Sequence, residues 1–259
     1  ALCDAAALPT DTGIAGLQSY EAWMDHESDH YPWPQFDERS AAALCYTSGT
    51  TGNPKGVLYS HRSTLLHTLM MLAPDTFGIS SAETLMLIVP MFHANAWSLA
   101  FSSVTAGAKL VLPGPKMDGV NLYELIETEQ VTMTAGVPTV WMMLLQHCQR
   151  NHLKIHGLKR VVIGGSAAPE SMIDQLAEHG TEVRQLWGMT ELSPLGTLSK
   201  LTTRQLSLPA EQQQRLLEKQ GRVIYGVDMA IIDDDGRSLP WDEILTLGVV
   251  AAAVSTALR

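Results

Sequence analysis

Apolar residues follow two different spacings along the chain, and their alternation predicts the fold. Short continuous apolar runs are typical of buried strands, whereas apolar residues three and four positions apart are typical of helices. Mainly apolar runs occupy residues 41–46, 57–60, 84–89, 108–112, 131–135 and 160–163, and residues 182–186 predict a further strand. Helical spacing occupies residues 63–72, 96–105, 120–128, 138–149 and 169–179. Strands separated by helices indicate an α/β fold with a mostly parallel sheet flanked by helices.

The two ends of the chain depart from this pattern. Residues 17–26 predict a short helix, and residues 25–39 are rich in Pro, Asp, His and aromatic residues, as a connecting loop would be. Residues 205–219 predict a polar helix, and residues 221–236 predict β-structure that turns at an Asp-rich tip near the C-terminus. We therefore expect three parts: a connecting segment at residues 1–40, an α/β core at residues 41–205, and a polar helix with a partial β subdomain and an atypical tail at residues 206–259.

Composition narrows the function classes. The chain has 259 residues, of which 46% are hydrophobic and 17% charged, so we expect a folded protein with a real core. A net charge of −10 argues against nucleic acid as a partner. Cys3, Cys45 and Cys148 are scattered without a CxxC spacing, which argues against a disulfide framework and favours the cytoplasm. No apolar run has the length of a transmembrane segment.

Residues 46–56, with the sequence YTSGTTGNPKG, form the most distinctive segment. Its glycines allow backbone N–H groups to approach an anion closely, its hydroxyl groups add donors, and Lys55 adds a positive charge. The common P-loop is excluded, because Asn53 and Pro54 stand near the place of its Gly-Lys pair. A polar surface turn is the alternative. The density of hydroxyl groups favours a loop that holds a polyphosphate, and we name residues 47–55 the phosphate loop.

Three further motifs follow in order. They are residues 90–97 (PMFHANAW), 164–169 (GGSAAP) and 185–191 (QLWGMTE). The second motif, and residues 187–191 of the third, come directly after predicted strands. In parallel sheets, ligands bind at the loops beyond the carboxyl ends of the strands, so this placement favours a binding site.

Together these motifs resemble those of the adenylate-forming superfamily, which includes acyl-CoA synthetases, firefly luciferase and peptide-synthetase adenylation domains. Residues 194–197 (PLGT) make the chain most similar to medium- and long-chain fatty acyl-CoA synthetases. The resemblance implies the central part of the large N-terminal domain of such an enzyme. It also implies the reaction, in which a carboxylate attacks the α-phosphorus of ATP, pyrophosphate leaves, and coenzyme A attacks the resulting acyl-adenylate.

The same resemblance implies a role for each motif. Glu191 would bind Mg²⁺, Thr190 would donate its hydroxyl to the α-phosphate, and Trp187 would stack on adenine. His93 would lie near the substrate carboxylate, and Lys55 would complete the catalytic set beside the β- and γ-phosphates. The other residues expected to bind the nucleotide are Thr47, Ser48, Gly49, Thr50, Thr51, Gly52, Gly165, Ser166, Ala167, Ala168, Pro169, Gly188 and Met189.

The substrate is expected to be an apolar acid. Ala94, Ala96 and Gly165 are small residues near Met and Trp, which suggests a tunnel for an alkyl chain. No charged residue stands where the ammonium group of an amino acid would need a partner. A fatty acid, ATP and CoA are therefore the expected small-molecule substrates, and a homodimer remains open.

The resemblance covers residues 41–236 and then stops. The ribose-binding Asp and the adenylation Lys of the family have no counterpart in residues 243–259, so we expect an incomplete piece that binds nucleotide weakly and turns over poorly. Two alternatives stay open: a non-catalytic remnant that binds nucleotide or acyl groups, and another adenylating enzyme such as a luciferase-like or aryl-acid ligase.

Overall fold

The computed structural model describes residues 2–3, 13–47, 53–233, 235, 237–240 and 249–254. The chain divides into two compact units, Ala1–Asp37 and Glu38–Arg259. In the first unit, strands β1 (Leu2–Cys3) and β2 (Gln18–Ser19) pair in parallel. Ser19 then caps helix α1 (Tyr20–Met24), whose position agrees with the predicted short helix. The other elements all belong to the second unit.

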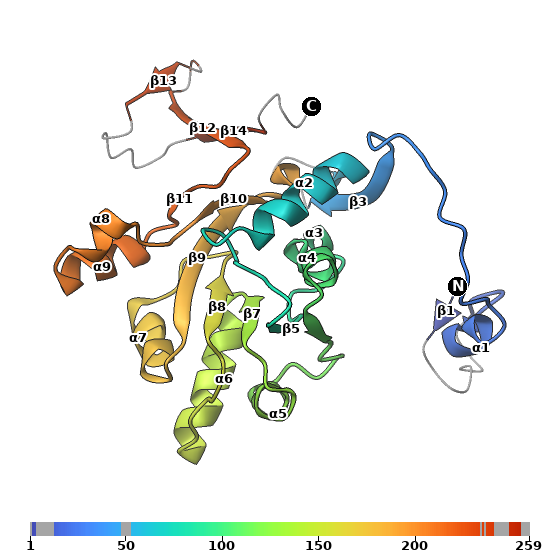
Figure 1. Ribbon diagram of the computed structural model, residues 1–259, viewed down its shortest axis with the longest axis horizontal. Helices are drawn as coiled ribbons and strands as arrows, with labels where there is room; N and C mark the ends of the chain where they lie inside the picture. Colours follow the sequence, from blue (N-terminus) through green and yellow to red (C-terminus); the bar gives the residue numbers. More distant parts are fainter. Residues whose placement is uncertain are drawn as a thin grey trace. The chain divides into compact units, whose positions relative to one another are not determined.

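A seven-stranded sheet forms the centre of the second unit, in the order β11-β10-β9-β8-β7-β5-β6 (Figure 1). The strands from β6 to β9 run parallel, whereas β10 and β11 are antiparallel to their neighbours. The mostly parallel sheet predicted from the apolar runs is confirmed. The strands are β5 (Thr84–Met86), β6 (Lys109–Val111), β7 (Met133–Gly136), β8 (Arg160–Ile163), β9 (Glu182–Gly188), β10 (Leu195–Leu198) and β11 (Arg222–Val223).

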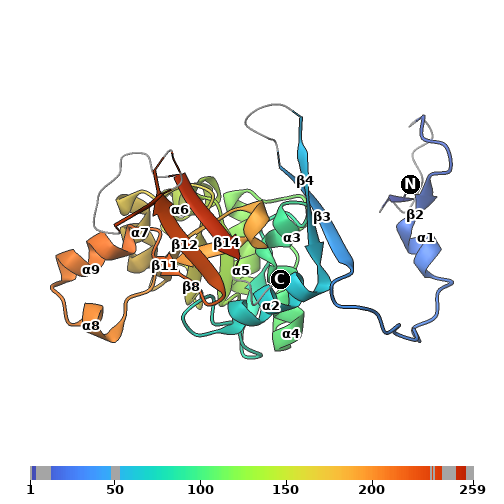
Figure 2. The same ribbon diagram turned by 90° about the horizontal axis from the view of Figure 1, so that it is seen from above.

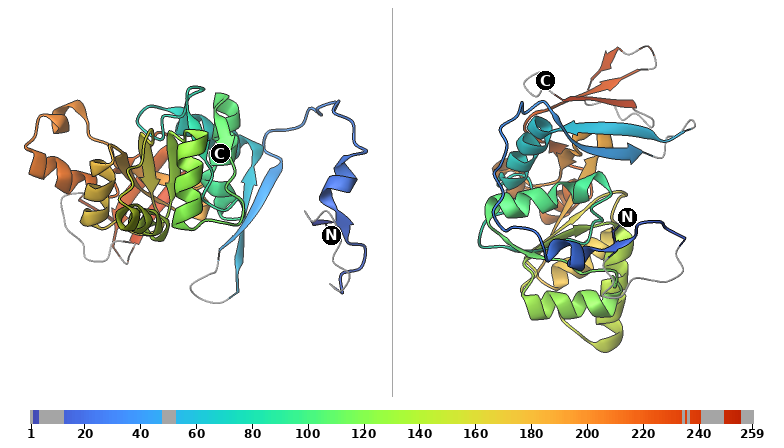
Figure 3. Two further views of the ribbon diagram at one scale, coloured as in Figure 1. Left: turned by 90° about the horizontal axis from the view of Figure 1, so that it is seen from below. Right: turned by 90° about the vertical axis from the view of Figure 1, so that its right-hand side faces the viewer.

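Helices cover both faces of this sheet, so its strands are buried on both sides. Successive residues of β8 point to opposite faces: Val161 and Ile163 join one hydrophobic cluster, and Val162 joins the other. The cluster around Val161 holds side chains of α5 (Gly119–Glu129), α6 (Pro138–Asn151) and α7 (Glu170–Glu178), the helices seen in Figure 3. The cluster around Val162 holds those of α2 (His61–Leu72) and α4 (Leu99–Ala106). Burial of both faces explains the continuous apolar runs.

The chain enters this unit through a long hairpin of strands β3 (Ala41–Thr47) and β4 (Lys55–Ser60), which Figure 2 shows as a separate ribbon. One face of the hairpin is buried at Cys45 and Tyr59, which are 4% and 3% exposed. The other face carries the exposed side chains of Leu44, Tyr46 and Leu58. Ser60 ends the hairpin and caps α2 through reciprocal bonds with Ser63, so the strand passes directly into the helix.

Three sequence predictions need correction. Residues 205–219 form two helices, α8 (Thr203–Leu206) and α9 (Ala210–Leu217), because Pro209 has no N–H and restricts Leu208 to extended backbone. The predicted strand at residues 84–89 is regular only in β5. Strand β10 was missed, since a four-residue run containing Gly196 carries little periodic signal.

Beyond β11 the chain forms a small antiparallel sheet of β12 (Val227–Ile232), β13 (Ser238–Leu239) and β14 (Val249–Val254). The predicted turn joins β12 to β13. Asp233 organises it, because its carboxylate accepts hydrogen bonds from the backbone N–H groups of Asp235 and Arg237 at 3.0 and 2.8 Å. Strand β14 falls within the segment that we described as an atypical tail, and it pairs with β12 along its whole length.

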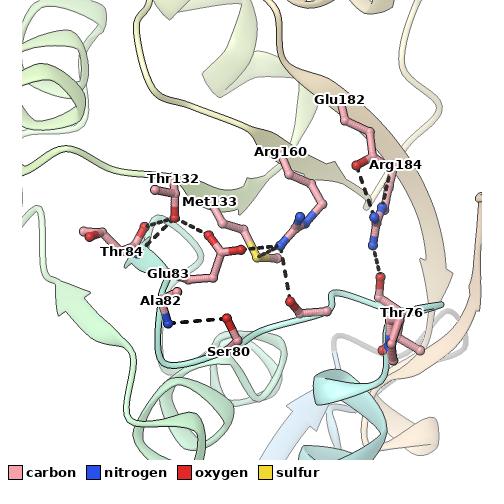
Figure 4. A network of polar contacts seen from close by, with 12 residues as sticks. Thr76, Ser80, Ala82, Glu83, Thr84, Thr132, Met133, Arg160, Glu182 and Arg184 are labelled. Atoms are coloured by element: carbon pink, nitrogen blue, oxygen red, sulfur yellow. Dashed lines mark hydrogen bonds and ion pairs between the residues drawn. The ribbon is translucent and has the colours of Figure 1, made fainter.

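A buried ion pair lies at the amino-terminal ends of the parallel strands (Figure 4). Glu83 and Arg160 are joined at 3.1 Å, and their side chains are 11% and 12% exposed. The Thr132 hydroxyl also donates to the Glu83 carboxylate. Burying a charge is costly unless it is paired. This cluster must therefore remain intact for the strands to pack at their amino-terminal ends.

Arg184 forms a second paired cluster beside the first (Figure 4). Its guanidinium, 6% exposed, donates to Glu182 at 2.7 Å and also to the carbonyl of Thr76. Thr76 lies in the connection between α2 and β5. The two clusters therefore fasten this connection to strands β8 and β9.

Candidate active site

A cavity of about 230 Å³ opens where strand β9 ends. The residues lining its mouth, His93, Met189 and Thr190, are exposed or half-buried. Its interior is apolar and closed, since Met71 and Phe77 line it and are fully buried. A cavity that is polar at the mouth and apolar inside suits an acid whose carboxylate stays near the surface.

A second cavity of about 350 Å³ adjoins the first, because Gly165 and Gly188 line both. Ser166, Ala167 and Trp187 complete its wall on the side of the second and third motifs. The structure thus brings together predicted site residues from three separated segments, including His93, Gly165 and Thr190. Ala168 is buried beside them, and its N–H donates to the Gln185 side chain at 2.9 Å.

Two glycines allow the site to close. A Cβ on Gly188 would lie 2.2 Å from the carbonyl oxygen of Pro194, so any side chain there would separate the end of β9 from the residues that lead into β10. A Cβ on Gly196 would lie 2.7 Å from the ring of Trp187. The indole therefore lies directly over the backbone of β10, and this contact fixes the aromatic wall of the second cavity.

Residues 189–195, which we name the Thr190 corner, contain the 3₁₀ helix η1 (Thr190–Leu192). Side chains from three elements hold this corner through its backbone. The Tyr59 hydroxyl donates to the carbonyl of Thr190 at 2.5 Å, and the Ser98 hydroxyl donates to the carbonyl of Ser193 at 3.3 Å. The N–H of Leu195 donates to Nε2 of His67 at 3.1 Å.

The first predicted site motif forms an unusual turn. Helix α3 (Ala94–Trp97) belongs to a run, from Ala94 to Ser98, in which every residue has φ between 46° and 61°. None of these residues is glycine, and left-handed backbone costs other residues about 1–2 kcal/mol each. A regular helix was predicted from residue 96, and this is wrong at its start because α4 begins only at Leu99. The turn buries Ala96 and Trp97 in the core while it leaves His93 at the cavity mouth.

Burial perturbs two titratable groups around the corner. It raises the pKa of Tyr59 well above its ordinary value, and the neighbouring Cys45 and Glu191 side chains raise it further. Burial also lowers the pKa of His67 to about 3, so this ring is neutral. Since Nε2 of His67 accepts a hydrogen bond, its proton must be on Nδ1, which is buried without a partner among the described residues.

Of the predicted phosphate loop, the structure describes Thr47, Lys55 and the two residues before Lys55. Thr47 and Lys55 pair across the end of the hairpin, and the Thr47 hydroxyl donates to the Lys55 carbonyl at 3.4 Å. The predicted residues Ser48, Gly49, Thr50, Thr51 and Gly52 lie outside the described residues. What the structure does show is that the hairpin contacts the Thr190 corner through Tyr59.

Glu191 is the best-placed carboxylate for a metal ion. It is exposed on the corner, and no hydrogen bond or ion pair joins its side chain to another described residue. In the part of the chain that the structure describes, no three His, Cys, Asp or Glu side chains gather into a metal site. One free carboxylate fits Mg²⁺, which usually takes one or two protein carboxylates and completes its shell with water and phosphate oxygens.

Sequence reasoning missed Tyr59, His67 and Ser98, which hold the corner. The sequence carries a weak sign of two of them. Tyr59 lies two residues after Val57, on the same face of a strand, and His67 is a lone polar ring four residues before Met71, on the same face of a helix. Nothing in the sequence predicts their partners, which lie about a hundred residues away in the chain.

Comparison with known proteins places the chain in a family. The profile of the family described as AMP-binding enzyme matches residues 4–250. The chain belongs to this family. This confirms the resemblance drawn from the motifs and agrees with the fold described above.

The relatives are acid–CoA ligases. The chain is 49% identical over 230 residues to the medium-chain-fatty-acid–CoA ligase of Ectopseudomonas oleovorans, a match covering 88% of this chain and 42% of that protein. It is 47% identical over 232 residues to the 3-methylmercaptopropionyl-CoA ligase of Ruegeria lacuscaerulensis, covering 89% of this chain and 43% of that protein. The chain thus spans less than half the length of the curated relatives it matches.

A solved structure shows the same fold. The inhibitor-bound N-terminal domain of FACL13 from Mycobacterium tuberculosis superposes with a TM-score of 0.73 at 26% identity, covering 86% of this chain and 54% of that chain. Among the helices in the described part of this chain, none has the length and apolarity needed to cross a membrane.

Proposed function

We propose that the chain is the adenylating part of an AMP-forming acid–CoA ligase. The observation that carries the proposal is the pair of adjoining cavities, which unite His93, Gly165, Trp187 and Thr190 from three separated motifs. One cavity is apolar and closed, as an acyl group requires. The other has an aromatic wall and backbone-rich lining, as a purine requires.

The reaction has two displacements. A carboxylate oxygen of the acid attacks the α-phosphorus of ATP, and the bond to the β-phosphate breaks, so pyrophosphate leaves with the electron pair. The thiolate of CoA then attacks the acyl carbon, and AMP leaves. Both steps bring together negative groups, so they need cations and N–H donors at the phosphoryl oxygens.

Each predicted residue has a place in this scheme. Trp187 and residues 164–169 would hold adenine, and Thr190 would donate its hydroxyl to the α-phosphate. The Glu191 carboxylate would hold Mg²⁺, which neutralises phosphate oxygens when bound. Lys55, with residues 47–52, would bind the β- and γ-phosphates. His93, at the mouth of the acyl cavity, would orient the substrate carboxylate.

The acyl cavity favours an apolar acid of short to medium length. No Lys, Arg, Asp or Glu is among the residues that line it, so an ammonium group would have no partner. Its volume of about 230 Å³ lies below the roughly 300–1,000 Å³ usual for ligand sites. The relatives named above agree with this class: one is named for medium-chain fatty acids and the other for a small thioether acid.

Calorimetry with the complete 259-residue chain tests the proposal. AMP, ATP with Mg²⁺, and a non-hydrolysable octanoyl-adenylate mimic would be titrated, and pyrophosphate release would be followed with octanoate and ATP. The mimic should bind more tightly than AMP by at least about tenfold, because each buried methylene adds about 0.8 kcal/mol. Glu191→Ala should remove the Mg²⁺ dependence of ATP binding, while Glu178→Ala, on the exposed side of α7, should keep it.

The outcomes separate the candidate functions. No binding of AMP or the mimic would refute the proposal. Slow pyrophosphate release is expected of an incomplete piece, so binding of both ligands with no release at all would favour a binding module that lacks the chemistry. Preference for an aromatic acyl-adenylate mimic over the octanoyl mimic would favour an aryl-acid ligase.

A further inference from the structure

The Thr190 corner carries the side chains proposed to address the α-phosphate and the magnesium ion, yet the contacts that hold it are made to its backbone. Tyr59 donates to the carbonyl of Thr190, and His67 accepts from the N–H of Leu195, the last residue of the corner. Both side chains are almost fully buried, at 3% and 1% exposure. Because these hydrogen bonds are made to the backbone, they leave the Thr190 and Glu191 side chains free for a ligand.

Tyr59 reaches the corner from the hairpin that carries the phosphate loop. It lies on the buried face of β4, diagonally across from Cys45 on β3, and the two side chains interact. The thiol of Cys45 in turn donates to Oδ1 of Asn95 at 3.7 Å, and Asn95 belongs to the left-handed turn. Nδ2 of Asn95 is buried without a partner among the described residues. One small buried group of side chains therefore joins the hairpin, the turn beside His93, and the corner.

Resting on the proposed function, we propose that Tyr59 is a positioning residue for the Mg²⁺–triphosphate part of the site. Its hydroxyl fixes the Thr190 carbonyl to the hairpin. The Thr190 hydroxyl and the Glu191 carboxylate are thereby presented in fixed register with Thr47 and Lys55 at the hairpin's end. Removing the hydroxyl would leave the Thr190 carbonyl with the N–H of Ser193 as its donor, at 3.3 Å, and free the corner from the hairpin.

The adenine side of the site does not depend on this bond. Trp187 rests on Gly196, and residues 165–167 line the second cavity; none of these contacts involves Tyr59. Loss of the hydroxyl should therefore weaken the binding of Mg²⁺–ATP and leave unchanged the binding of adenosine, which has no phosphate for Thr190 to bind. A purely structural role for Tyr59 would instead weaken both ligands together, or neither.

The test compares Tyr59→Phe with Tyr123→Phe. Tyr123 is a matched control, because its hydroxyl also donates to a backbone carbonyl, that of Lys154 at 3.3 Å, but on α5. Mg²⁺–ATP affinity should fall about tenfold in Tyr59→Phe, the effect of one lost hydrogen bond to a buried group, with adenosine affinity unchanged. Tyr123→Phe should match the wild type for both ligands.

Amide hydrogen exchange supplies a readout that needs no nucleotide. The N–H groups of Met189, Leu192 and Leu195 are hydrogen-bonded within the corner or to His67, and they should exchange about tenfold faster in Tyr59→Phe at unchanged global stability. Unchanged exchange would overturn the positioning role. Faster exchange with unchanged Mg²⁺–ATP affinity would overturn the coupling to the triphosphate. Failure of the wild-type chain to bind nucleotide would refute the proposed function itself, and the exchange result would still decide whether Tyr59 holds the corner.

Discussion

The two ends of the parallel strands in the central sheet differ in how their charged groups are paired. At the amino-terminal edge, Glu83 with Arg160 and Glu182 with Arg184 form ion pairs whose arginines are buried (Figure 4). At the carboxyl-terminal ends of the strands, no ion pair joins His93 or Glu191 to another described residue, and the same holds for Lys55 in the hairpin. Charged groups at the amino-terminal ends are paired within the protein, whereas those at the carboxyl-terminal ends remain available to a ligand.

Backbone conformation shows the same contrast. The carboxyl-terminal edge holds the left-handed run from Ala94 to Ser98, together with left-handed Ser193 in the Thr190 corner. Such strain persists only where surrounding contacts enforce it, and it is common at binding sites. Here Tyr59, His67 and Ser98 supply those contacts. Strained backbone at the carboxyl-terminal ends of the strands therefore lowers the stability of the fold. Paired charges and apolar burial elsewhere offset this loss.

The largest expected effect is a loss of stability when the ion pair of Glu83 and Arg160 is broken. Arg160→Ala would leave Glu83 buried without its partner, and such a loss costs about 3–5 kcal/mol. Unfolding in guanidinium chloride measures it. Arg215→Ala, which breaks a pair whose side chains are 71% and 76% exposed, should cost less than about 1 kcal/mol. Equal losses of unfolding free energy in the two variants would show that the Glu83–Arg160 pair is not a source of stability.

Next comes the backbone at the end of β9. In Gly188→Ala the new methyl group meets the Pro194 carbonyl at 2.2 Å, so the corner must shift, at about 3 kcal/mol, and AMP binding should fall more than about tenfold. Gly180→Ala, at φ +83° with nothing within 4 Å, should cost about 1 kcal/mol and leave AMP binding unchanged. Thermal melts and calorimetry measure both quantities. If Gly188→Ala kept wild-type AMP affinity, the proposed placement of the nucleotide would be wrong.

A pH effect of intermediate size should come from His67. Its pKa is about 3 when folded and about 6.5 when unfolded, so below pH 6.5 the unfolded chain binds a proton that the folded chain excludes. This contribution is fully present above pH 6.5 and is lost as the pH falls toward 3; at pH 5 the loss is roughly 2 kcal/mol.

Urea unfolding of wild type and His67→Gln at pH 7.5 and pH 5 measures this effect. Glutamine can still accept from Leu195 but does not titrate, so the variant should lose less stability on acidification. His152→Asn removes an exposed histidine from a left-handed position that asparagine tolerates, and it should keep the wild-type pH dependence. Identical acid sensitivity in wild type and His67→Gln would contradict the buried neutral ring.

The smallest effect concerns the closed end of the acyl cavity. Phe77→Leu should open space there and move the preferred acyl-adenylate mimic by one or two carbons, at about fourfold in affinity per methylene. A series of mimics from butanoyl to dodecanoyl, titrated into wild type and variant, measures the shift. Leu122→Met, a volume-conserving change in the other cluster, is the control and should leave the preference unchanged. An unchanged optimum in Phe77→Leu would show that the acyl chain does not reach this residue.

Local patterns predicted most of the fold, and the resemblance to adenylate-forming enzymes implied the candidate site residues. The apolar run that became β8 could be read directly, since Val161, Val162 and Ile163 are buried on both faces and leave no polar gap. Strand β9 was predicted although it carries buried Arg184 and Gln185. The motifs around His93, Gly165 and Thr190 were identified from residue type and order. Strand β10 could not be found in this way, because its pairing with β9 depends on Gly188 and Gly196 fitting against residues already folded.

The sequence by itself determined that an α/β sheet forms and which segments follow its strands, because periodicity and turn chemistry act between near neighbours. Only the tertiary structure decided that Tyr59 meets Thr190, that His67 meets Leu195, and that Ala94–Ser98 turns left-handed. These features rest on contacts between residues far apart in the chain, whose energies exceed local preference only once the sheet and its helices have closed around them.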